Sequence, residues 1–260
     1  MKYLSFLVVC FLLASCSPTG INNDYSSVGQ DSRTQFIVLH YTATDLTNSL
    51  RLLTQEQVSA HYLINDNPPT VYRLVDENKR AWHAGNSFWQ GRSWLNSSSI
   101  GIEMVNFGYL ETDKGRQYQA WSEPQIEQLI VLLKNLVKQH NIKPNAIVGH
   151  NEIAPQRKQD PGPLFPWKRL ADEGLIIWPD AELVERYQVK YIKSLPNVLW
   201  FQEKLAEVGY LVPLTGELDE ETTNVISVFQ MKYRPQNFRG IPDAQTAALL
   251  EALLAAQASI

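Results

Sequence analysis

The 260-residue chain has only two cysteines, Cys10 and Cys16, and both lie close to the N-terminus. Beyond Cys16 the sequence therefore contains no residue that could form a disulfide or supply a thiolate to a metal. The formal net charge is -4, with no long run of charges of either sign. Binding to nucleic acid is not expected, because it requires a basic face. Hydrophobic residues make up 44% of the chain, which favours a packed core over general disorder.

The first apolar run, from Leu4 to Ala14, is too short for an ordinary membrane span. It follows Lys2, and a positive residue before a run of this length is typical of a signal peptide. The run ends in LASC at 13–16, which resembles the lipobox of bacterial lipoproteins, where cleavage precedes an acylated cysteine. A plain secretory signal with a chance cysteine is the alternative. Small residues at both positions before Cys16 favour the lipobox.

The lipobox interpretation predicts a lipoprotein of the outer membrane that faces the periplasm. Residues 1–15 would form the signal peptide, and Cys16 would carry the acyl chains that anchor the protein in the membrane. Ser17, rather than Asp, after the cysteine resembles the signal for sorting to the outer membrane. Residues 16–33 are interpreted as a flexible tether, because the segment after the cysteine is rich in Ser, Asn, Asp and Gly.

Short apolar segments alternate with amphipathic ones between residues 34 and 178. The apolar segments predict strands at 36–39, 61–64, 70–75, 100–105 and 146–148. Helices are predicted at 54–60 and at 125–140, where apolar residues fall on one stripe. Ser122 and Gln125 have the spacing of a capping box for the second helix. This alternation favours an α/β domain whose sheet is covered by helices.

The C-terminal part of the chain contains an internal repeat. The segment GELDEET at 216–222 recurs 24 residues later as GIPDAQT at 240–246. Each glycine would end one element, and each aspartate would cap the next helix. A Phe-Gln pair also recurs, at 201–202 and at 229–230, each on an apolar helical stripe. The repeat predicts a small helical module, and a module that serves only in packing is the alternative reading.

Two of the five histidines stand at strand ends. His40 follows the predicted strand 36–39, and His150 follows the strand 146–148. Asp160 comes ten residues later, in a proline-rich loop that is able to return it towards His150. Two imidazoles and one carboxylate leave the fourth position of a zinc ion open for water, which is the arrangement of catalytic sites. The spacing matches no short zinc signature, so ordinary polar roles for these histidines stay open.

Residues 149–167 (GHNEIAPQRKQDPGPLFPW) resemble, nearly residue for residue, a segment of the zinc N-acetylmuramoyl-L-alanine amidases of the AmpD/AmiD family. Other blocks similar to this family lie at 36–43, 59–64, 81–85 and 99–106. The family belongs to the superfamily of amidases and peptidoglycan-recognition proteins. The resemblance therefore implies a zinc amidase domain over residues 34–178, with a mixed central sheet flanked by helices.

The C-terminal repeat resembles the peptidoglycan-binding domain type 1. This likeness implies a small three-helix domain over residues 193–260, joined to the amidase domain by a connector at 179–192. Such a module would add a tether to the cell wall. Whether it binds glycan or only braces the catalytic domain stays open at the level of sequence.

The resemblance also implies the roles of individual residues. His40, His150 and Asp160 match the ligands of one Zn²⁺ ion. Glu103 matches the catalytic carboxylate, and Lys158 matches a lysine that steadies the transition state. From the residues alone, Glu103 interrupts an apolar strand, and a strand carboxylate that faces solvent is the alternative.

Three further residues are candidates for contact with substrate. Tyr41 stands where the cytoplasmic relatives have Asn, and Asn151 stands where many relatives have Ser. His83 lies in the block AWHAG, and a structural role beside its tryptophan is the alternative. His61 and His140 are interpreted as structural, the latter as a helix-end cation.

The resemblance implies an enzyme that hydrolyses the amide bond between N-acetylmuramic acid, or its anhydro form, and L-alanine of the peptidoglycan stem peptide. The expected partners are peptidoglycan, muropeptides and the membrane, and the protein is expected to be a monomer. A peptidoglycan receptor without catalytic activity is one alternative. A zinc peptidase that cuts within the stem peptide is the other.

Overall fold

The structure, a computed structural model, describes residues 21–259. The predicted signal peptide at 1–15 and the predicted lipidation site Cys16 lie outside the described residues. Residues 21–31 belong to a separate unit, are exposed and contain no helix or strand. Within residues 21–259, no helix combines the length and the apolar character that a membrane span requires.

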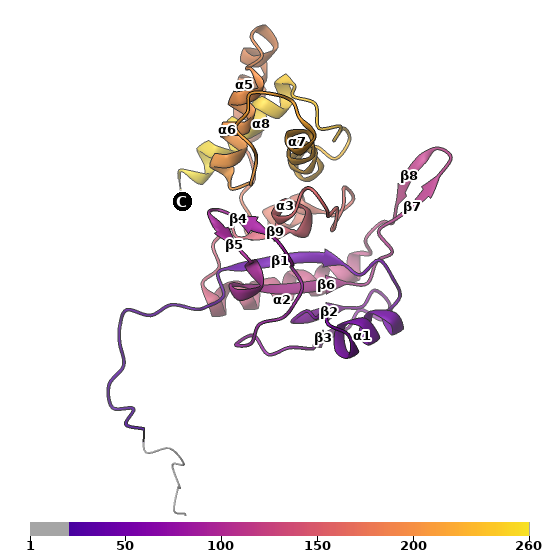
Figure 1. Ribbon diagram of the computed structural model, residues 1–260, viewed down its shortest axis with the longest axis vertical. Helices are drawn as coiled ribbons and strands as arrows, with labels where there is room; N and C mark the ends of the chain where they lie inside the picture. The colour runs from indigo at the N-terminus through magenta and orange to yellow at the C-terminus, as the bar shows by residue number, and fades with distance from the viewer. Residues whose placement is uncertain (1–20, 260) are drawn as a thin grey trace, which may run out of the picture. The chain divides into compact units, whose positions relative to one another are not determined.

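The second unit is built on a five-stranded sheet with the order β3-β2-β6-β1-β9 (Figure 1). Strands β2, β6, β1 and β9 are parallel to one another, and only β3 at the edge is antiparallel. The predicted mixed sheet is therefore confirmed. Its strands are β1 (Phe36–Tyr41), β2 (Tyr62–Ile64), β3 (Val71–Arg73), β6 (Ser99–Met104) and β9 (Ile147–Gly149).

Helices flank the sheet, as predicted, and the longest is α2 (Glu123–His140) (Figure 1). Its buried apolar residues join those of β1, β6 and β9 in one continuous core. Burying one side chain of the size of valine or leucine stabilises the fold by about 1.5–3 kcal/mol. Shorter elements complete the domain: η1 (Leu95–Ser97), α3 (His150–Ile153), α4 (Trp167–Asp172), and the hairpins β4 (Phe88–Trp89) with β5 (Arg92–Ser93) and β7 (Tyr109–Thr112) with β8 (Gly115–Tyr118).

The predicted helix at 54–60 is wrong. The helix in this region is α1 (Leu46–Gln55), which begins after Asp45, whose side chain accepts a hydrogen bond from the backbone of Asn48. This cap fixes the start of the helix, and Leu46, Leu50 and Leu53 then share one face of it. The sequence signal was the Asp cap, which decides the helix start more strongly than the residues at 56–60.

The predicted capping box of α2 is also wrong. Ser122 does precede the helix, but its hydroxyl donates to Asp66 rather than accepting from the helix. The Gln125 amide donates to the carbonyls of Ile64 and Val105, at 3.2 and 3.0 Å. Both side chains therefore fasten α2 to the end of the sheet, which a local sequence pattern does not reveal.

Four helices follow the amidase-like region among the described residues. They are α5 (Ala181–Lys193), α6 (Val198–Val208), α7 (Glu220–Tyr233) and α8 (Ala244–Gln257). The last three form the predicted small module, and α5 occupies the segment predicted as a connector. Helix α5 packs along α8 and is capped by Asp180 (Figure 1). The connector segment is thus a structural part of the C-terminal bundle.

The repeated aspartates cap the helices as predicted. Asp219 accepts a hydrogen bond from the backbone of Thr222 at the start of α7, and Asp243 accepts one from Thr246 at the start of α8. Each cap satisfies a backbone N–H that the helix leaves without a partner. The repeated motif therefore marks the beginning of two equivalent helices.

The repeated glutamines hold these caps in place. Gln202 on α6 is fully buried. Its amide donates to the Thr222 hydroxyl at 2.8 Å and to the Glu217 carbonyl at 3.0 Å, and its carbonyl accepts from the Gly216 backbone at 2.8 Å. One side chain thus connects α6 to the turn and the first residues of α7.

Gln230 on α7 makes the same set of contacts one repeat later. Its amide donates to the Thr246 hydroxyl and to the Ile241 carbonyl, and its carbonyl accepts from the Gly240 backbone, all at 2.9 Å. The Gly240 contact is buried, whereas the Gly216 contact is only partly buried. The repeat in the sequence is therefore a repeated packing device, in which each glutamine fixes the next helix.

Replacing Gln230 by Leu is expected to lower the free energy of unfolding by about 2–4 kcal/mol, because it leaves buried backbone groups without partners. Gln202→Leu is the matched control and is expected to cost less, because water can reach the backbone of Gly216. Chemical denaturation of the two variants measures the difference. Equal losses would contradict the role assigned to the buried Gly240 contact.

Candidate metal centre

The parallel register of the sheet brings the predicted site residues to one edge. His40 lies opposite Glu103 where β1 pairs with β6, and Leu39 lies opposite Gly149 where β1 pairs with β9. His150 directly follows Gly149. Parallel strands end at the same edge of a sheet, and residues opposite one another point to the same face. His40 and Glu103 are therefore neighbours on one face, with His150 beside them.

The loop after β9 returns Asp160 to the same point. The backbone N–H of Asn151 donates to the Asp160 carbonyl at 2.9 Å, which closes the loop. The Asp160 Oδ2 atom then lies 3.0 Å from His150 Nδ1 and 3.1 Å from His40 Nδ1. The two Nδ1 atoms are 2.9 Å apart. Three buried donor atoms therefore converge, and together these residues could hold a metal ion.

Each imidazole makes a hydrogen bond through the ring nitrogen that points away from Asp160, and this bond decides which nitrogen carries the proton. His150 Nε2 lies 3.2 Å from the Ala84 carbonyl, which can only accept, so Nε2 carries the proton. With the proton on Nε2, the lone pair of the ring is at Nδ1. This is the nitrogen that faces Asp160.

A longer chain of hydrogen bonds does the same for His40. The Ser99 hydroxyl donates to the Leu95 carbonyl at 2.6 Å, so it accepts from His83 Nε2 at 3.1 Å. Neutral His83 consequently accepts at Nδ1, 3.0 Å from His40 Nε2. His40 Nε2 therefore carries a proton and Nδ1 a lone pair. Two lone pairs and a carboxylate at this spacing repel one another unless a cation lies between them, which fits a metal site.

Gly101 makes room for His83. A Cβ atom on Gly101 would lie 2.3 Å from the His83 ring, so only glycine is compatible with this packing. Gly101 belongs to β6, on the same face as Ser99 and Glu103. Burial holds the pKa of His83 well below its usual value, and the nearby His40 lowers it further. His83 is thus a neutral residue stacked on the sheet behind His40.

The electrostatics favour the protonation states that bind a metal. Burial, followed by the neighbouring His150, lowers the pKa of His40 to about 4. Burial acts to raise the pKa of Asp160, but the two imidazoles beside it, His150 first, hold this pKa below its usual value. At neutral pH the centre therefore holds a neutral His40 imidazole and an ionised Asp160 carboxylate, and metal ligands must be deprotonated in this way.

Glu103 is enclosed beside the centre rather than exposed to solvent. Its side chain is 15% exposed, and its Oε1 atom lies 4.0 Å from His40 Nδ1. Among the described residues, its Oε2 atom is buried and has no hydrogen-bond partner. Burial, followed by the charge of Asp160, raises the pKa of Glu103 to about 8. An unpartnered carboxylate at this point is available for proton transfer, and the solvent-facing alternative is wrong.

An open cleft of about 380 Å³ leads to the centre. Lys158 and Tyr41 line it together with Asp160. Burial, followed by the charge of Asp160, raises the pKa of the Tyr41 hydroxyl, so this group stays neutral. Tyr109 of the β7–β8 hairpin and Asn224 of α7 also line the cleft. The C-terminal bundle therefore contributes a residue to the entrance of the site, which the sequence did not reveal.

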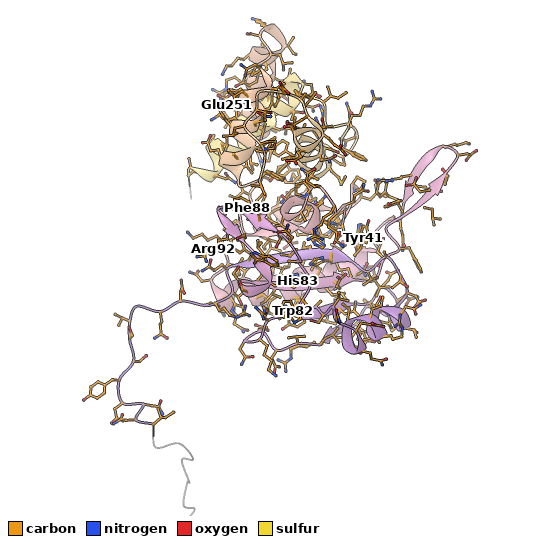
Figure 2. All side chains as sticks on the ribbon, in the orientation of Figure 1. Tyr41, Trp82, His83, Phe88, Arg92 and Glu251 are labelled. Atoms are coloured by element: carbon orange, nitrogen blue, oxygen red, sulfur yellow. The ribbon has the colours of Figure 1, made fainter. Side chains whose placement is uncertain are left out.

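Two of the residues predicted to contact substrate lie elsewhere. His83, labelled with Tyr41 in Figure 2, uses both ring nitrogens in hydrogen bonds to His40 and Ser99. It does not line the cleft. Asn151 is buried, and its amide donates to the Met231 sulfur of α7 at 3.4 Å. Neither position supports direct contact with substrate. The structural role that was the alternative for His83 is the one that its contacts support. Asn151 packs between α3 and α7.

The two remaining histidines have structural partners. His61 Nδ1 accepts from the Gly101 backbone at 3.0 Å, and its Nε2 donates to the Lys79 carbonyl at 3.1 Å. His140 contacts Glu77 at 2.5 Å, so it pairs with a carboxylate in addition to lying near a helix end. Both contacts agree with the structural roles predicted for these residues.

A family model described as N-acetylmuramoyl-L-alanine amidase matches residues 30–163. The chain belongs to this family. A second model, described as a putative peptidoglycan binding domain, matches residues 194–250 of the amidase. AmiD of Escherichia coli strain K12, an N-acetylmuramoyl-L-alanine amidase, is 44% identical over 230 residues, which cover 85% of this chain and 83% of that protein. Membership of the AmpD/AmiD family is therefore confirmed.

Solved structures agree along most of the amidase. Escherichia coli AmiD in complex with anhydro-N-acetylmuramic acid-L-Ala-D-gamma-Glu-L-Lys matches with a TM-score of 0.82 at 39% identity, covering 90% of this chain and 94% of that one. AmpDH3 of Pseudomonas aeruginosa in complex with anhydromuramic pentapeptide has a TM-score of 0.84 at 37% identity, with coverages of 90% and 97%. These matches include the C-terminal region and confirm the predicted fold class.

Replacing Ser99 by Ala is expected to weaken metal binding by the amidase about tenfold, since the hydrogen-bond chain that orients His40 loses its end. Competition with a chelator measures the dissociation constant for zinc, the ion predicted from the family resemblance. Ser98→Ala removes a neighbouring buried hydroxyl outside this chain and is the control. An unchanged zinc affinity in Ser99→Ala would show that the chain does not position His40.

Proposed function

We propose that the amidase hydrolyses the amide bond between N-acetylmuramic acid, or its anhydro form, and L-alanine of the peptidoglycan stem peptide. The observation that carries the proposal is the convergence of His40, His150 and Asp160 beside the unpartnered carboxylate of Glu103. The family membership supports it, as do the anhydromuramyl peptides bound to the similar structures. Peptidoglycan and its muropeptides are accordingly the proposed partners.

The proposed cofactor is one zinc ion, held by His40 Nδ1, His150 Nδ1 and Asp160 Oδ2. Two nitrogens and one oxygen suit zinc, and three protein ligands leave a position open for catalysis. When bound, zinc would acidify water and polarise the scissile carbonyl. The lone pairs that the structure aims at one point are the observation that fits this ion.

Glu103 is the proposed general base and acid. It takes a proton from the water that attacks the carbonyl carbon, and it gives this proton to the α-nitrogen of L-alanine as the C–N bond breaks. The free Oε2 atom supports both steps, and the raised pKa of Glu103 shows that its environment favours the protonated form, which the second step uses. Lys158, which lines the same cleft, would place its positive charge near the developing oxyanion.

The complete set of residues argues against a receptor that binds peptidoglycan without cutting it. A receptor needs neither a buried carboxylate without a partner nor a convergent set of donor atoms, because both are costly to maintain. A zinc peptidase could use the same groups on a bond within the stem peptide. The anhydromuramyl ligands of the similar structures favour the muramyl amide bond as the substrate.

Glu103→Gln is expected to keep zinc but to lower turnover by at least about a hundredfold, because the acid–base group is lost while the ligands remain. His150→Ala is expected to lose both zinc and turnover. Zinc content and the release of stem peptides from cell walls are measured on residues 17–260. Treatment of the wild-type protein with EDTA should abolish release, and added zinc should restore it. Near-normal hydrolysis by Glu103→Gln would contradict its role.

Mass spectrometry of the products distinguishes the proposed function from both alternatives. An intact stem peptide that begins at L-alanine is the expected product of a muropeptide digest. Shortened stem peptides would identify a peptidase. Binding to cell walls without release that is sensitive to EDTA would identify a receptor.

We also propose that the protein is a lipoprotein of the outer membrane, anchored through Cys16 and facing the periplasm. The proposal is supported by the lipobox-like sequence before Cys16 and by the sorting residue Ser17. Cys16→Ser is expected to prevent lipidation and to abolish recovery of the mature protein in the outer-membrane fraction. Cell fractionation and immunoblotting measure this. A variant that remains in the outer membrane would contradict the anchor.

A further inference from the structure

A buried ion pair joins the C-terminal bundle to the helix that begins with His150. Lys232 of α7 and Glu152 of α3 lie 2.9 Å apart, and their side chains are 6% and 2% exposed. The Lys232 ammonium also lies 4.1 Å from the centre of the Trp167 ring. Figure 1 shows α3 between α7 and the central sheet, so this pair lies between the bundle and the sheet.

Glu152 uses both carboxylate oxygens to connect the bundle with the start of α3. Its Oε2 atom accepts from Lys232 at 2.9 Å and from the Gly149 backbone at 2.7 Å. Its Oε1 atom accepts from Lys232 at 3.0 Å and from the Tyr210 hydroxyl at 3.2 Å. Lys232 and Tyr210 both belong to the C-terminal bundle. The orientation of Glu152 is therefore fixed from the bundle, while it holds the residue before His150.

The same turn contains one of the three converging residues, His150, and binds the backbone of another, Asp160. His150 follows Gly149, and the backbone N–H of the next residue, Asn151, donates to the Asp160 carbonyl. A Cβ on Gly149 would lie within 3 Å of the Asn151 side chain and of Pro161, so the turn has little freedom to shift. A displacement of Gly149 would consequently move His150 and the start of the loop that returns Asp160.

We propose that Lys232 is a positioning residue for the metal centre: through Glu152 it fixes Gly149 and thereby the ligand His150. The C-terminal bundle is on this view a structural part of the catalytic unit, in addition to any contact it makes with the cell wall. The inference rests on the proposed metal-binding role of His150. It extends that role to a residue in the region that matches the peptidoglycan-binding model.

The energetics favour a positioning role over simple adhesion. Desolvating two charges is costly, and an apolar pair of similar volume often stabilises an interface as well as a buried ion pair does. A carboxylate, unlike an apolar side chain, can hold the Gly149 N–H in one geometry. Elsewhere the interface uses neutral contacts, such as Asn224 with Gln156 at 2.8 Å. The charged pair occurs two residues after His150, and its carboxylate also binds the residue before His150.

The test replaces Lys232 by Met in residues 17–260, which contain every described helix and strand. The dissociation constant for zinc, measured by competition with a chelator, is expected to rise about tenfold or more, because Glu152 loses its counter-ion and releases Gly149. Lys232→Arg retains the charge and should recover part of the affinity. Arg234→Met is the matched control: it breaks the Arg234–Asp243 ion pair, and the hydrogen-bond partners of Arg234 all belong to the same bundle.

The zinc affinities of the variants test the positioning role of Lys232, and zinc binding by the wild-type protein tests the proposed function. The inference would be overturned if Lys232→Met bound zinc as tightly as the wild type and Arg234→Met do, while the two variants lost similar thermal stability. The ion pair would then be a structural contact only. If the wild-type protein itself binds no zinc, the proposed function fails instead. Should Lys232→Met not fold, Lys232→Gln keeps a hydrogen bond to Glu152 without the charge, and the same comparison of zinc affinities decides.

Discussion

The parallel pairing of β1 with both β6 and β9 is the constraint on which the site depends. His40 and His150 are 110 residues apart in sequence, and only this register places their Nδ1 atoms 2.9 Å apart. The same register places Glu103 opposite His40. A slip of one residue would turn these side chains to the other face of the sheet, where the apolar core packs. The hydrophobic pattern that fixes the sheet therefore also fixes the chemistry.

Burial gives the centre its reactivity but requires that each polar atom around it be satisfied. The Ser99 hydroxyl, His83 and the Ala84 carbonyl satisfy the outer nitrogens of His40 and His150. They also decide which nitrogen keeps its lone pair. Among the described residues, Glu103 Oε2 and Asn151 Oδ1 are the buried side-chain atoms without a hydrogen-bond partner. One unsatisfied atom is thus on the residue whose proposed role is to exchange protons.

Much of this arrangement could be predicted from the sequence, and the failures have a common cause. The strand ends at His40 and His150 were visible as the ends of apolar runs, and the family blocks added Glu103. The role of His83 was not decided, because it depends on the space that Gly101 leaves on a distant strand. Likewise, Ser122 and Gln125 bind groups far away in sequence instead of forming a capping box. Local patterns predict local structure, and tertiary partners override them.

The C-terminal bundle shows why a repeat can serve more than its own packing. Gln202 and Gln230 each fix the start of the following helix, so the bundle is internally rigid. Rigidity is what allows Lys232 to hold Glu152 in one place, because a mobile helix would transmit no fixed position to α3. A module joined only by a flexible linker would need no buried charge at its boundary. The ion pair therefore argues that the bundle and the amidase domain act as one folded unit at the metal centre.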